Sequence, residues 1–493
     1  MKILFIYSLD DVQSTLKPMR RWPTIQFGIS YISSVLKAHG HQTRLLVLGS
    51  NQRWKDNRRL LKSSIEEFAP GLICFTAIFS QYAFMEKIAR FTRNHWPDKF
   101  LIIGGVHATL NPNEVINGPF DALCIGEGEY PTLELCRQLE LEEAPHGIAN
   151  LWIKSHNGKI GKNEPRDFLQ DINMLPFPDR EIWKPWMKEQ RDAQFSVLLG
   201  RGCPYSCTYC SNHALRKVTR GKYTRFRSPE NILKEVAFLY NNYPLRRIYF
   251  EVETIAANKT WAIELCRQLE AFNATTDHSL SYGCNFRISP QSMDEELFMA
   301  FKKAHFYGIN IGLESGSEKI RREVLKRNYS NEDFLNVVSM ARKYGLSVRV
   351  FNMIGLPGES LRDHMETVFL NQQCQPDGHY TGIFFPYPGT ELYNTCIQQG
   401  LLKGLVNTQL ERRQANLELP YFTKTQIQHA YTWFNYRVYK GHRPFLLIVI
   451  QVIAAKIKSY PMTNYLFHHK LPVLQLLHKL RRAVNFFGRY IKI

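Results

Sequence analysis

Apolar runs and amphipathic helical patterns alternate along the first 140 residues of this 493-residue chain. Five runs resemble strands and are apolar throughout: KILFIYSL, HQTRLLVLG, GLICFTAI, FLIIGG and DALCIGE. A strand that is apolar on both faces belongs in a parallel sheet covered by helices on both sides. We therefore predict an α/β, doubly wound domain over residues 1–140, whose ligand lies beyond the carboxyl ends of its strands.

A second series of strand and helix patterns follows a proline-rich segment. Residues 141–190 include Pro165, Pro176, Pro178 and Pro185, which interrupt any long element, and we predict a linker there. Six strand patterns come next, at 196–200, 247–252, 281–286, 308–313, 347–354 and 379–386. A closed TIM barrel needs eight strands, so residues 191–404 are predicted to form a partial (βα)6 TIM-like barrel with its active site at the strand carboxyl ends.

The last segment, residues 405–493, is predicted to be a basic α-helical region. The formal net charge is +19, and from residue 419 onward the chain has twelve Lys and Arg but no Asp or Glu. The apolar run at 445–455 is shorter than the roughly 20 residues that cross a bilayer. Residues 473–487 show the pattern of an amphipathic basic helix.

Several interpretations of this basic region stay open. It is a solvated basic surface, or it binds anionic membrane lipid, a phosphate-bearing substrate or nucleic acid. Nucleic acid is the weakest of these, because the aromatic residues lie in apolar stripes and not between Lys and Arg. We expect a cytoplasmic protein, since the N-terminal apolar run is too short for a secretory signal and the ten cysteines show no regular disulfide framework. A peripheral contact with the membrane stays one of the open interpretations of the basic region.

Three of the ten cysteines gather in GRGCPYSCTYCSN, residues 200–212, directly after the first strand of the second series. A structural zinc site needs four ligands, and no second C-x2-C pair follows. The remaining alternatives are a disulfide with a spare thiol and three inert buried thiols. A reducing compartment argues against the first, and the Gly- and Pro-containing loop argues against the second. Iron–sulfur clusters are bound by thiolates, usually four for a 4Fe-4S cluster, so three thiolates leave one iron open.

The spacing C-x3-C-x2-C at the first strand of a six-stranded βα series resembles the radical S-adenosylmethionine (SAM) superfamily. The resemblance implies that Cys203, Cys207 and Cys210 hold a 4Fe-4S cluster and that Tyr209 lies on the adenine side of the site. It also implies that the open iron chelates SAM, and that an electron from the cluster cleaves SAM to a 5′-deoxyadenosyl radical. Gly200 and Gly202 are expected to let the loop turn away from its strand.

Further strand ends of the second series match the same family. The resemblance implies that Glu253, in FEVET, approaches the SAM amino group, although Val252 stands where many relatives carry an Asp. It places Arg287 at the end of the third strand, and Glu314 and Ser315 at the end of the fourth, near the SAM carboxylate and ribose. The alternative for Arg287 and Glu314 is a structural ion pair with each other.

The first domain resembles the Rossmann-like cobalamin-binding domain that often precedes a radical SAM core. The stretches IIGGVHATLNPNEV and DALCIGEGEYPTLEL carry this resemblance, which implies that Thr76, Gly104 and Gly105 contact cobalamin. Relatives that ligate cobalt through histidine use D-x-H-x-x-G after the first strand, where this chain has SLDDVQST. We therefore expect cobalamin without a lower histidine ligand, and we interpret His107 as a polar loop residue.

Together these resemblances, which cover about residues 1–400, predict a cobalamin-dependent radical SAM methyltransferase acting on an unactivated carbon. One alternative is an oxidative cyclase or rearrangement enzyme of the anaerobic magnesium-protoporphyrin monomethyl ester cyclase type. A second is a non-catalytic, membrane-associated protein that only binds a cluster. The expected partners are a small-molecule or lipid substrate and a low-potential electron donor such as flavodoxin or ferredoxin.

Overall fold

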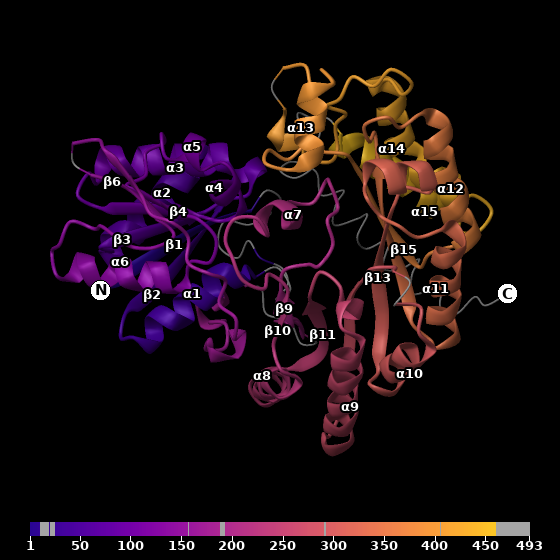
Figure 1. Cartoon of the computed structure of the whole chain (residues 1–493), viewed down its shortest axis with the longest axis horizontal. Coiled ribbons are helices and arrows are strands. Elements are labelled where there is room, and N and C mark those ends of the chain that lie inside the picture. The colour runs from indigo at the N-terminus through magenta and orange to yellow at the C-terminus, as the bar shows by residue number, and fades with distance from the viewer. Residues whose placement is uncertain are drawn as a thin grey trace. The chain divides into compact units, whose positions relative to one another are not determined.

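The computed structural model describes residues 1–9, 19, 25–155, 157–187, 193–289, 292–404 and 406–459 (Figure 1). The chain forms two compact units. The first comprises Met1–Arg287, Asp294–Gly308 and Tyr387–Glu391, and the second comprises Ile288–Met293, Ile309–Pro386 and the described residues from Leu392 onward. The amphipathic helix predicted at 473–487 and most of the segment SLDDVQST lie outside the described residues.

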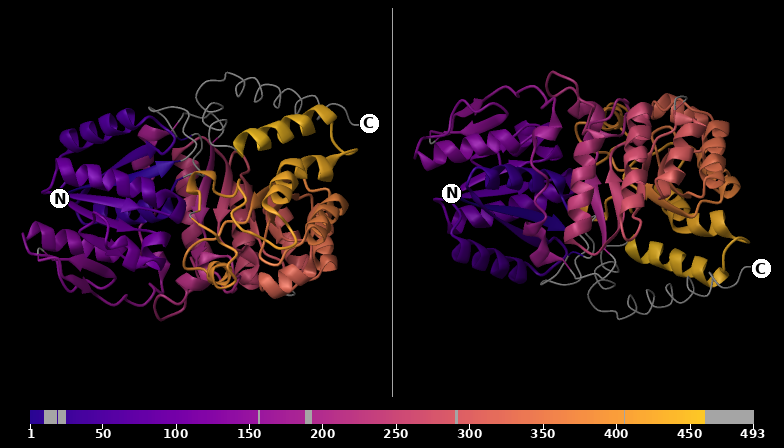
Figure 2. Two further views of the ribbon diagram at one scale, coloured as in Figure 1. Left: turned by 90° about the horizontal axis from the view of Figure 1, so that it is seen from above. Right: turned by 90° about the horizontal axis from the view of Figure 1, so that it is seen from below.

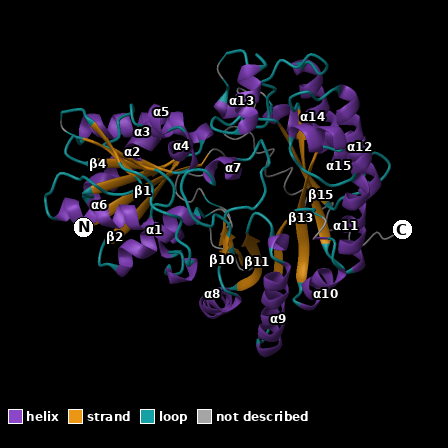
Figure 3. Ribbon diagram, in the orientation of Figure 1, coloured by secondary structure: helices purple, strands orange, loops and turns teal. Residues whose placement is uncertain are grey.

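The N-terminal domain is built on a parallel sheet, as predicted (Figures 1 and 3). Five strands pair in the order β2-β1-β3-β4-β5, all parallel. Their bounds are Lys2–Leu9 for β1, Gln42–Gly49 for β2, Leu72–Thr76 for β3, Phe100–Gly104 for β4 and Ala122–Cys124 for β5. The strand order reverses between β1 and β3, and in doubly wound folds the ligand lies beyond the carboxyl ends at this point.

Helices cover both faces of this sheet, which explains why its strands are apolar throughout (Figure 2). Helices α2 (Trp54–Phe68) and α3 (Phe79–His95) share one buried core with alternate strand residues such as Leu4, Ile73 and Leu101. Helices α1 (Phe27–Ala38) and α6 (Glu129–Glu140) pack against each other on the opposite face. Two short helices, α4 (Val106–Leu110) and α5 (Pro112–Val115), follow β4.

Two short antiparallel strands extend the sheet beyond β5. They are β6 (Leu151–Lys154) and β7 (Ile160–Lys162), and both lie in the segment predicted as a linker. Strands of four and three residues are too short to show an apolar periodicity, so the sequence pattern did not reveal them.

Further along the same segment, buried side chains connect the N-terminal domain to the first helix of the second series. Trp183, in the short 3-10 helix Glu181–Trp186, is fully buried and donates a hydrogen bond to Ser30 of α1 at 2.8 Å. Its neighbour Arg180 is also buried and forms an ion pair with Glu235 of α8 (Pro229–Asn242) at 2.8 Å. Glu235 pairs in addition with Arg227. A buried charge is costly without a partner, so these contacts tie the segment to the start of the second series.

The first unit also contains the first three strands of the second sheet. These are β8 (Ala193–Leu198), β11 (Leu245–Glu251) and β12 (Ser281–Phe286), paired in parallel. Helix α9 (Lys259–Thr275) connects β11 to β12, and α10 (Glu295–Lys303) follows β12. A small antiparallel pair, β9 (Gly200–Arg201) with β10 (Arg225–Phe226), encloses the cysteine loop and the short helix α7 (Ser211–Leu215).

The second unit contains the remaining strand and helix pairs. Its strands are β13 (Phe306–Glu314), which begins in the first unit, β14 (Ser347–Ile354) and β15 (Gly378–Ile383), and its helices are α11 (Asn331–Lys343), α12 (Leu361–Cys374), α13 (Glu391–Gln398), α14 (Lys424–Tyr439) and α15 (Phe445–Lys458). The six strands follow chain order across the sheet, β8-β11-β12-β13-β14-β15, which confirms the predicted six-stranded βα series. No helix among the described residues is long and apolar enough to cross a membrane.

Candidate active site

The three cysteines lie on the loop that runs from β9 to α7. Cys207 is buried, and Cys203 and Cys210 are half-buried. The backbone N–H of Cys210 donates to the Cys207 carbonyl at 3.1 Å, so the last two thiols share one tight turn. The same loop requires a glycine at Gly202, whose φ is +81° and whose missing Cβ would collide with the Tyr223 carbonyl.

Burial raises the pKa of two of the thiols, to about 11 for Cys203 and about 12 for Cys210. A thiol with a raised pKa binds metal as the thiolate. A nearby positive charge favours the thiolate, and a coordinating metal ion removes the proton outright. Among the described residues no group of three His, Cys, Asp or Glu lies close enough to ligate one metal ion. A 4Fe-4S cluster does not need such a group, because each thiolate binds a different iron. The three thiols on one loop are therefore compatible with a cluster.

A positive charge stands beside the middle thiol. Arg287, just after β12, donates from Nη1 to the Cys207 sulfur at 2.6 Å, and its guanidinium lies 3.9 Å from the ring centroid of Tyr205. Asn212 donates to the Cys210 sulfur at 3.6 Å. In this structure Arg287 thus contacts the loop itself. Its predicted contact with the SAM carboxylate stays a prediction.

The other residues predicted to contact SAM are found in both units. In the first unit Tyr209 is half-buried, while Glu253 is exposed and lines the cavity described below. In the second unit Glu314 is buried at the end of β13 with the left-handed φ of +66°, and it forms an ion pair with Arg327 at 3.3 Å. The partner that the structure gives Glu314 is therefore Arg327. Ser315 is fully buried, and its carbonyl accepts a hydrogen bond from Arg321.

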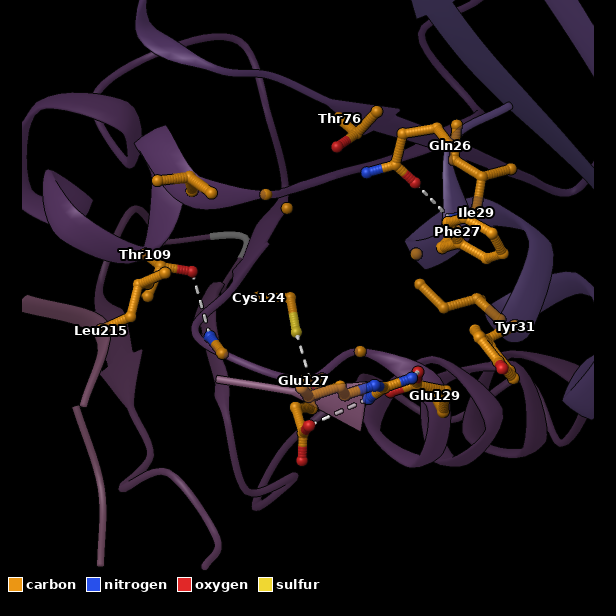
Figure 4. A pocket seen from close by; sticks show the side chains of 18 of the residues that line it. Gln26, Phe27, Ile29, Tyr31, Thr76, Thr109, Cys124, Glu127, Glu129 and Leu215 are labelled. Atoms are coloured by element: carbon orange, nitrogen blue, oxygen red, sulfur yellow. Dashed lines mark hydrogen bonds and ion pairs between the residues drawn. The ribbon is translucent and has the colours of Figure 1, made fainter. Parts of the chain in front are cut away.

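A cavity of about 690 Å³ lies in the first unit, at the carboxyl ends of the N-terminal strands (Figure 4). Thr76, Gly104 and Gly105, which were predicted to contact cobalamin, line it together. Gly200, Gly202 and Glu253, from the base of the cysteine loop and from the end of β11, complete another wall. None of the three cysteines is among the described residues that line this cavity.

The two glycines at the end of β4 play different parts. Gly105 has a φ of +97°, and a Cβ there would lie 2.8 Å from both the Ala77 carbonyl and the Thr76 hydroxyl. Its neighbour Gly104 has only an ordinary contact distance of 3.7 Å to Cys124. The fold therefore requires Gly105 because β3 and β4 approach closely, whereas Gly104 leaves space on the cavity side.

His107 does not line this cavity. Its side chain is buried in α4, where the ring lies 4.5 Å from that of Tyr82 and its Nδ1 accepts a hydrogen bond from Asn111 at 3.2 Å. Burial lowers its pKa to about 4. The residue is a neutral core histidine, not the polar loop residue that the sequence suggested.

Comparisons with known proteins agree with this arrangement. The model of the B12 binding domain matches residues 22–135, and that of the radical SAM superfamily matches residues 197–370. Similar proteins include an uncharacterized methyltransferase of Pyrococcus horikoshii, at 26% identity over 87% of this chain and 90% of the relative. Cytidylyl-2-hydroxyethylphosphonate methyltransferase of Streptomyces wedmorensis is 24% identical over 77% of this chain and 79% of its own.

A cyclase and a solved methyltransferase structure are also similar to this chain. The anaerobic magnesium-protoporphyrin IX monomethyl ester cyclase of Rubrivivax gelatinosus is 21% identical over 76% of this chain and 66% of its own. Among solved structures, the radical SAM methyltransferase TsrM of Kitasatospora setae, with cobalamin and a 4Fe-4S cluster bound, superposes with a TM-score of 0.64 at 17% identity. That match covers 82% of this chain and 79% of TsrM.

The chain combines a B12 binding domain, matched over residues 22–135, with a radical SAM core, matched over residues 197–370. The prediction of a cobalamin-binding domain ahead of a radical SAM core is thereby confirmed.

The cavity of this radical SAM protein has a polar wall that sequence reasoning missed (Figure 4). Glu127 and Glu129 follow β5 directly, and Arg201 and Arg225 come from the β9–β10 pair. The signal was present in GEGE, where two glycines alternate with two glutamates at a strand end that faces the ligand side. In the sequence, GEGE contributed only to the resemblance to a cobalamin-binding domain, and its two glutamates were not predicted as site residues.

A second carboxyl group stands beside Glu253 on this cavity. Glu251, the last residue of β11, accepts a hydrogen bond from Ser196 at 3.1 Å and lines the same wall. Burial raises the pKa of Glu251 to about 7, and the negative charge of Glu253 also raises it. The hydrogen bond from Ser196 lowers the pKa but does not offset these two effects. Glu251 is thus able to hold or release a proton near neutral pH.

We expect Glu251→Gln to make the free energy of unfolding less dependent on pH. Because the folded-state pKa of Glu251 is near 7 and the reference value is 4.5, its stabilising contribution is complete below pH 4.5 and is lost as the pH rises through 7. A shift of this size corresponds to on the order of 3 kcal/mol. Urea unfolding of both proteins at several pH values measures the difference, and an identical pH dependence would contradict it.

Proposed function

We propose that this protein is a cobalamin-dependent radical SAM methyltransferase. The observation that carries the proposal is the shared cavity. Thr76, Gly104 and Gly105 of the cobalamin-binding domain face the same space as Gly202 and Glu253 of the radical SAM core. Two cofactors that exchange a methyl group need such a common chamber, because reacting groups must be held within contact distance and away from water.

The residues of the chain supply a distinct place for each cofactor. Cys203, Cys207 and Cys210 would hold a 4Fe-4S cluster, and Tyr209 and Glu253 of the same unit would contact SAM at its open iron. Cobalamin would lie against the ends of β3 and β4. When bound, the cluster with SAM would supply one-electron bond cleavage, and cobalamin would supply a transferable methyl group.

In this proposal the chain's own groups orient the reactants and manage protons. Arg287 donates to the Cys207 sulfur and so holds the middle of the cysteine loop in place. Glu251 lies at the cavity with a pKa of about 7, which suits it to exchange a proton with a bound reactant. We place methyl transfer ahead of radical cyclisation because methyltransferases stand among the relatives that match this chain over most of both lengths.

Methyl transfer is tested by isotope tracing. The full chain is reconstituted anaerobically with iron, sulfide and cobalamin, reduced through flavodoxin or ferredoxin, and supplied with methyl-labelled SAM and an extract of small molecules and lipids. We expect label in a new product together with 5′-deoxyadenosine. An unlabelled product that forms with 5′-deoxyadenosine would contradict methyl transfer and favour the cyclase, and no 5′-deoxyadenosine at all would favour a non-catalytic cluster protein.

Cys207→Ala is expected to abolish SAM cleavage and to leave cobalamin binding intact. The variant removes one of the three thiolates, whereas Cys207 does not line the cavity. The control is Cys266→Ala, which alters a buried thiol on α9 outside the loop. Iron content, 5′-deoxyadenosine and the cobalamin absorbance spectrum are measured for both. SAM cleavage by Cys207→Ala at the wild-type rate would contradict the cluster assignment.

We also propose that the C-terminal region contacts an anionic membrane surface. Helix α15 exposes Phe445, Leu446 and Ile453 at 68%, 59% and 49%, and the chain carries no Asp or Glu from residue 419 onward. Apolar side chains combined with basic charge favour adsorption to anionic lipid.

Truncation after α15 tests the membrane proposal. Arg443 donates to the carbonyls of Pro376 and Asp377, so a deletion that begins at residue 440 would also damage the second unit. Removing only residues 460–493 deletes six Lys and Arg and is expected to weaken binding to anionic liposomes strongly. Neutral liposomes are the control, and unchanged binding to anionic liposomes would contradict the proposal.

A further inference from the structure

Four charged side chains connect the cobalamin-binding domain to the base of the cysteine loop. Arg201 donates to Glu127 at 2.9 Å and to Glu129 at 2.5 Å, so one guanidinium holds two carboxylates. Arg225 holds both oxygens of Glu127, each at 3.0 Å. We call these residues, Glu127, Glu129, Arg201 and Arg225, the interdomain clamp.

The clamp is largely buried, which makes the loss of any ion pair in it costly. The side chains of Arg225 and Glu129 are 4% and 5% exposed, and those of Arg201 and Glu127 are 17% and 22% exposed. Burial would raise the pKa of Glu127, but Arg201 and Arg225 lower it below the usual value, so the carboxylate stays charged. A buried ion that loses its partner is strongly unfavourable, and therefore the two sides of the clamp stay together.

Neighbouring groups fix the orientation of both arginines. Arg201 lies over the ring of Tyr31 at 5.2 Å, and Arg225 lies over that of Phe168 at 5.0 Å. The backbone of Leu169 donates to Glu127 at 3.0 Å and accepts from Arg225 at 2.8 Å. Because one face of each guanidinium group lies against an aromatic ring and its N–H groups are hydrogen-bonded, the clamp has little freedom to rotate.

The position of the clamp in the chain links it to both predicted cofactors. Arg201 stands two residues before Cys203, and it pairs with Arg225 across the β9–β10 ladder. Glu127 lies on the loop after β5 and Glu129 is the first residue of α6, on the ligand side of the N-terminal sheet. All four side chains line the 690 Å³ cavity. The clamp therefore forms a wall that both halves of the site share.

We propose that the clamp sets the separation between the cobalamin site and the cysteine loop, with Arg201 as its positioning residue. The inference rests on the proposed function for the identity of the two cofactors. Arg201 binds neither of them in this proposal. It acts by holding the loop that begins at Gly202 against the domain that carries Thr76 and Gly104.

Arg201→Met tests the clamp, since it removes the guanidinium group that binds both carboxylates and keeps an unbranched apolar side chain of similar length to the arginine stem. The matched control is Arg166→Met, because Arg166 holds both oxygens of Glu134 on the same helix α6 and its other side-chain hydrogen bonds go to Asn150 and Ala149, away from the cysteine loop. Arg201→Lys provides a second variant that retains the charge but reaches only one carboxylate. Thermal unfolding confirms that each variant folds.

The first readout is hydrogen exchange of the protein without cofactors. We expect Arg201→Met to raise exchange simultaneously in residues 124–130 and in residues 200–210, because the clamp joins these two loops. Arg166→Met should leave residues 200–210 unchanged. If Arg201→Met fails to fold, Arg201→Lys should give the same pattern with a smaller amplitude. Unchanged exchange in residues 200–210, or an equal change in the Arg166→Met control, would overturn the inference.

The second readout uses the reconstituted protein. Pulsed dipolar EPR between the reduced cluster and cob(II)alamin is expected to give a narrow distance distribution in the wild type and a broader one in Arg201→Met, with cobalamin affinity weakened about tenfold. A wild-type distribution in Arg201→Met would overturn the inference. If the wild type takes up no cobalamin, the proposed function fails, while hydrogen exchange still decides whether the clamp joins the two loops.

Discussion

Two buried guanidinium groups hold the cysteine loop against the N-terminal domain. Arg201 and Arg225 lie in the interior of the first unit, where an unpaired charge is strongly destabilising. Glu127 and Glu129 satisfy them, and these carboxylates stand at the end of β5. The ends of the N-terminal strands and the start of the cysteine loop therefore meet at one place, and the cavity lies between them.

The three thiols and the carboxyl groups of the cavity wall lie in different surroundings. The three thiols lie back from the cavity, and burial raises the pKa of Cys203 and Cys210, so that they need a cation to become thiolates. Arg287 supplies one positive charge at Cys207. The cavity wall, in contrast, carries carboxylates paired with arginines and a carboxyl group, Glu251, whose pKa of about 7 allows it to titrate. In the proposed function, metal binding and proton exchange therefore fall to different parts of the first unit.

The periodicity of the sequence was enough to predict both strand series. Long, apolar strands such as β1 and helices of twelve or more residues leave a clear pattern, and the structure confirms them. The strands of two to four residues, β6, β7, β9 and β10, leave none. Motif resemblance brought Thr76, Gly104, Gly105 and Glu253 into consideration, and the structure gathers these four at one cavity. The SAM contacts predicted for Arg287, Glu314 and Ser315 stay predictions.

By itself the sequence determined the class of fold, the family and the three thiols, because these follow from local periodicity and from residues adjacent in the chain. Only the tertiary structure decided which charges meet. Glu127 and Arg201 are 74 positions apart, and Glu127 and Arg225 are 98 apart. Nothing in a local pattern distinguishes a solvated Arg or Glu from one that is buried and paired. That difference arises when the chain brings distant strand ends together and removes them from water.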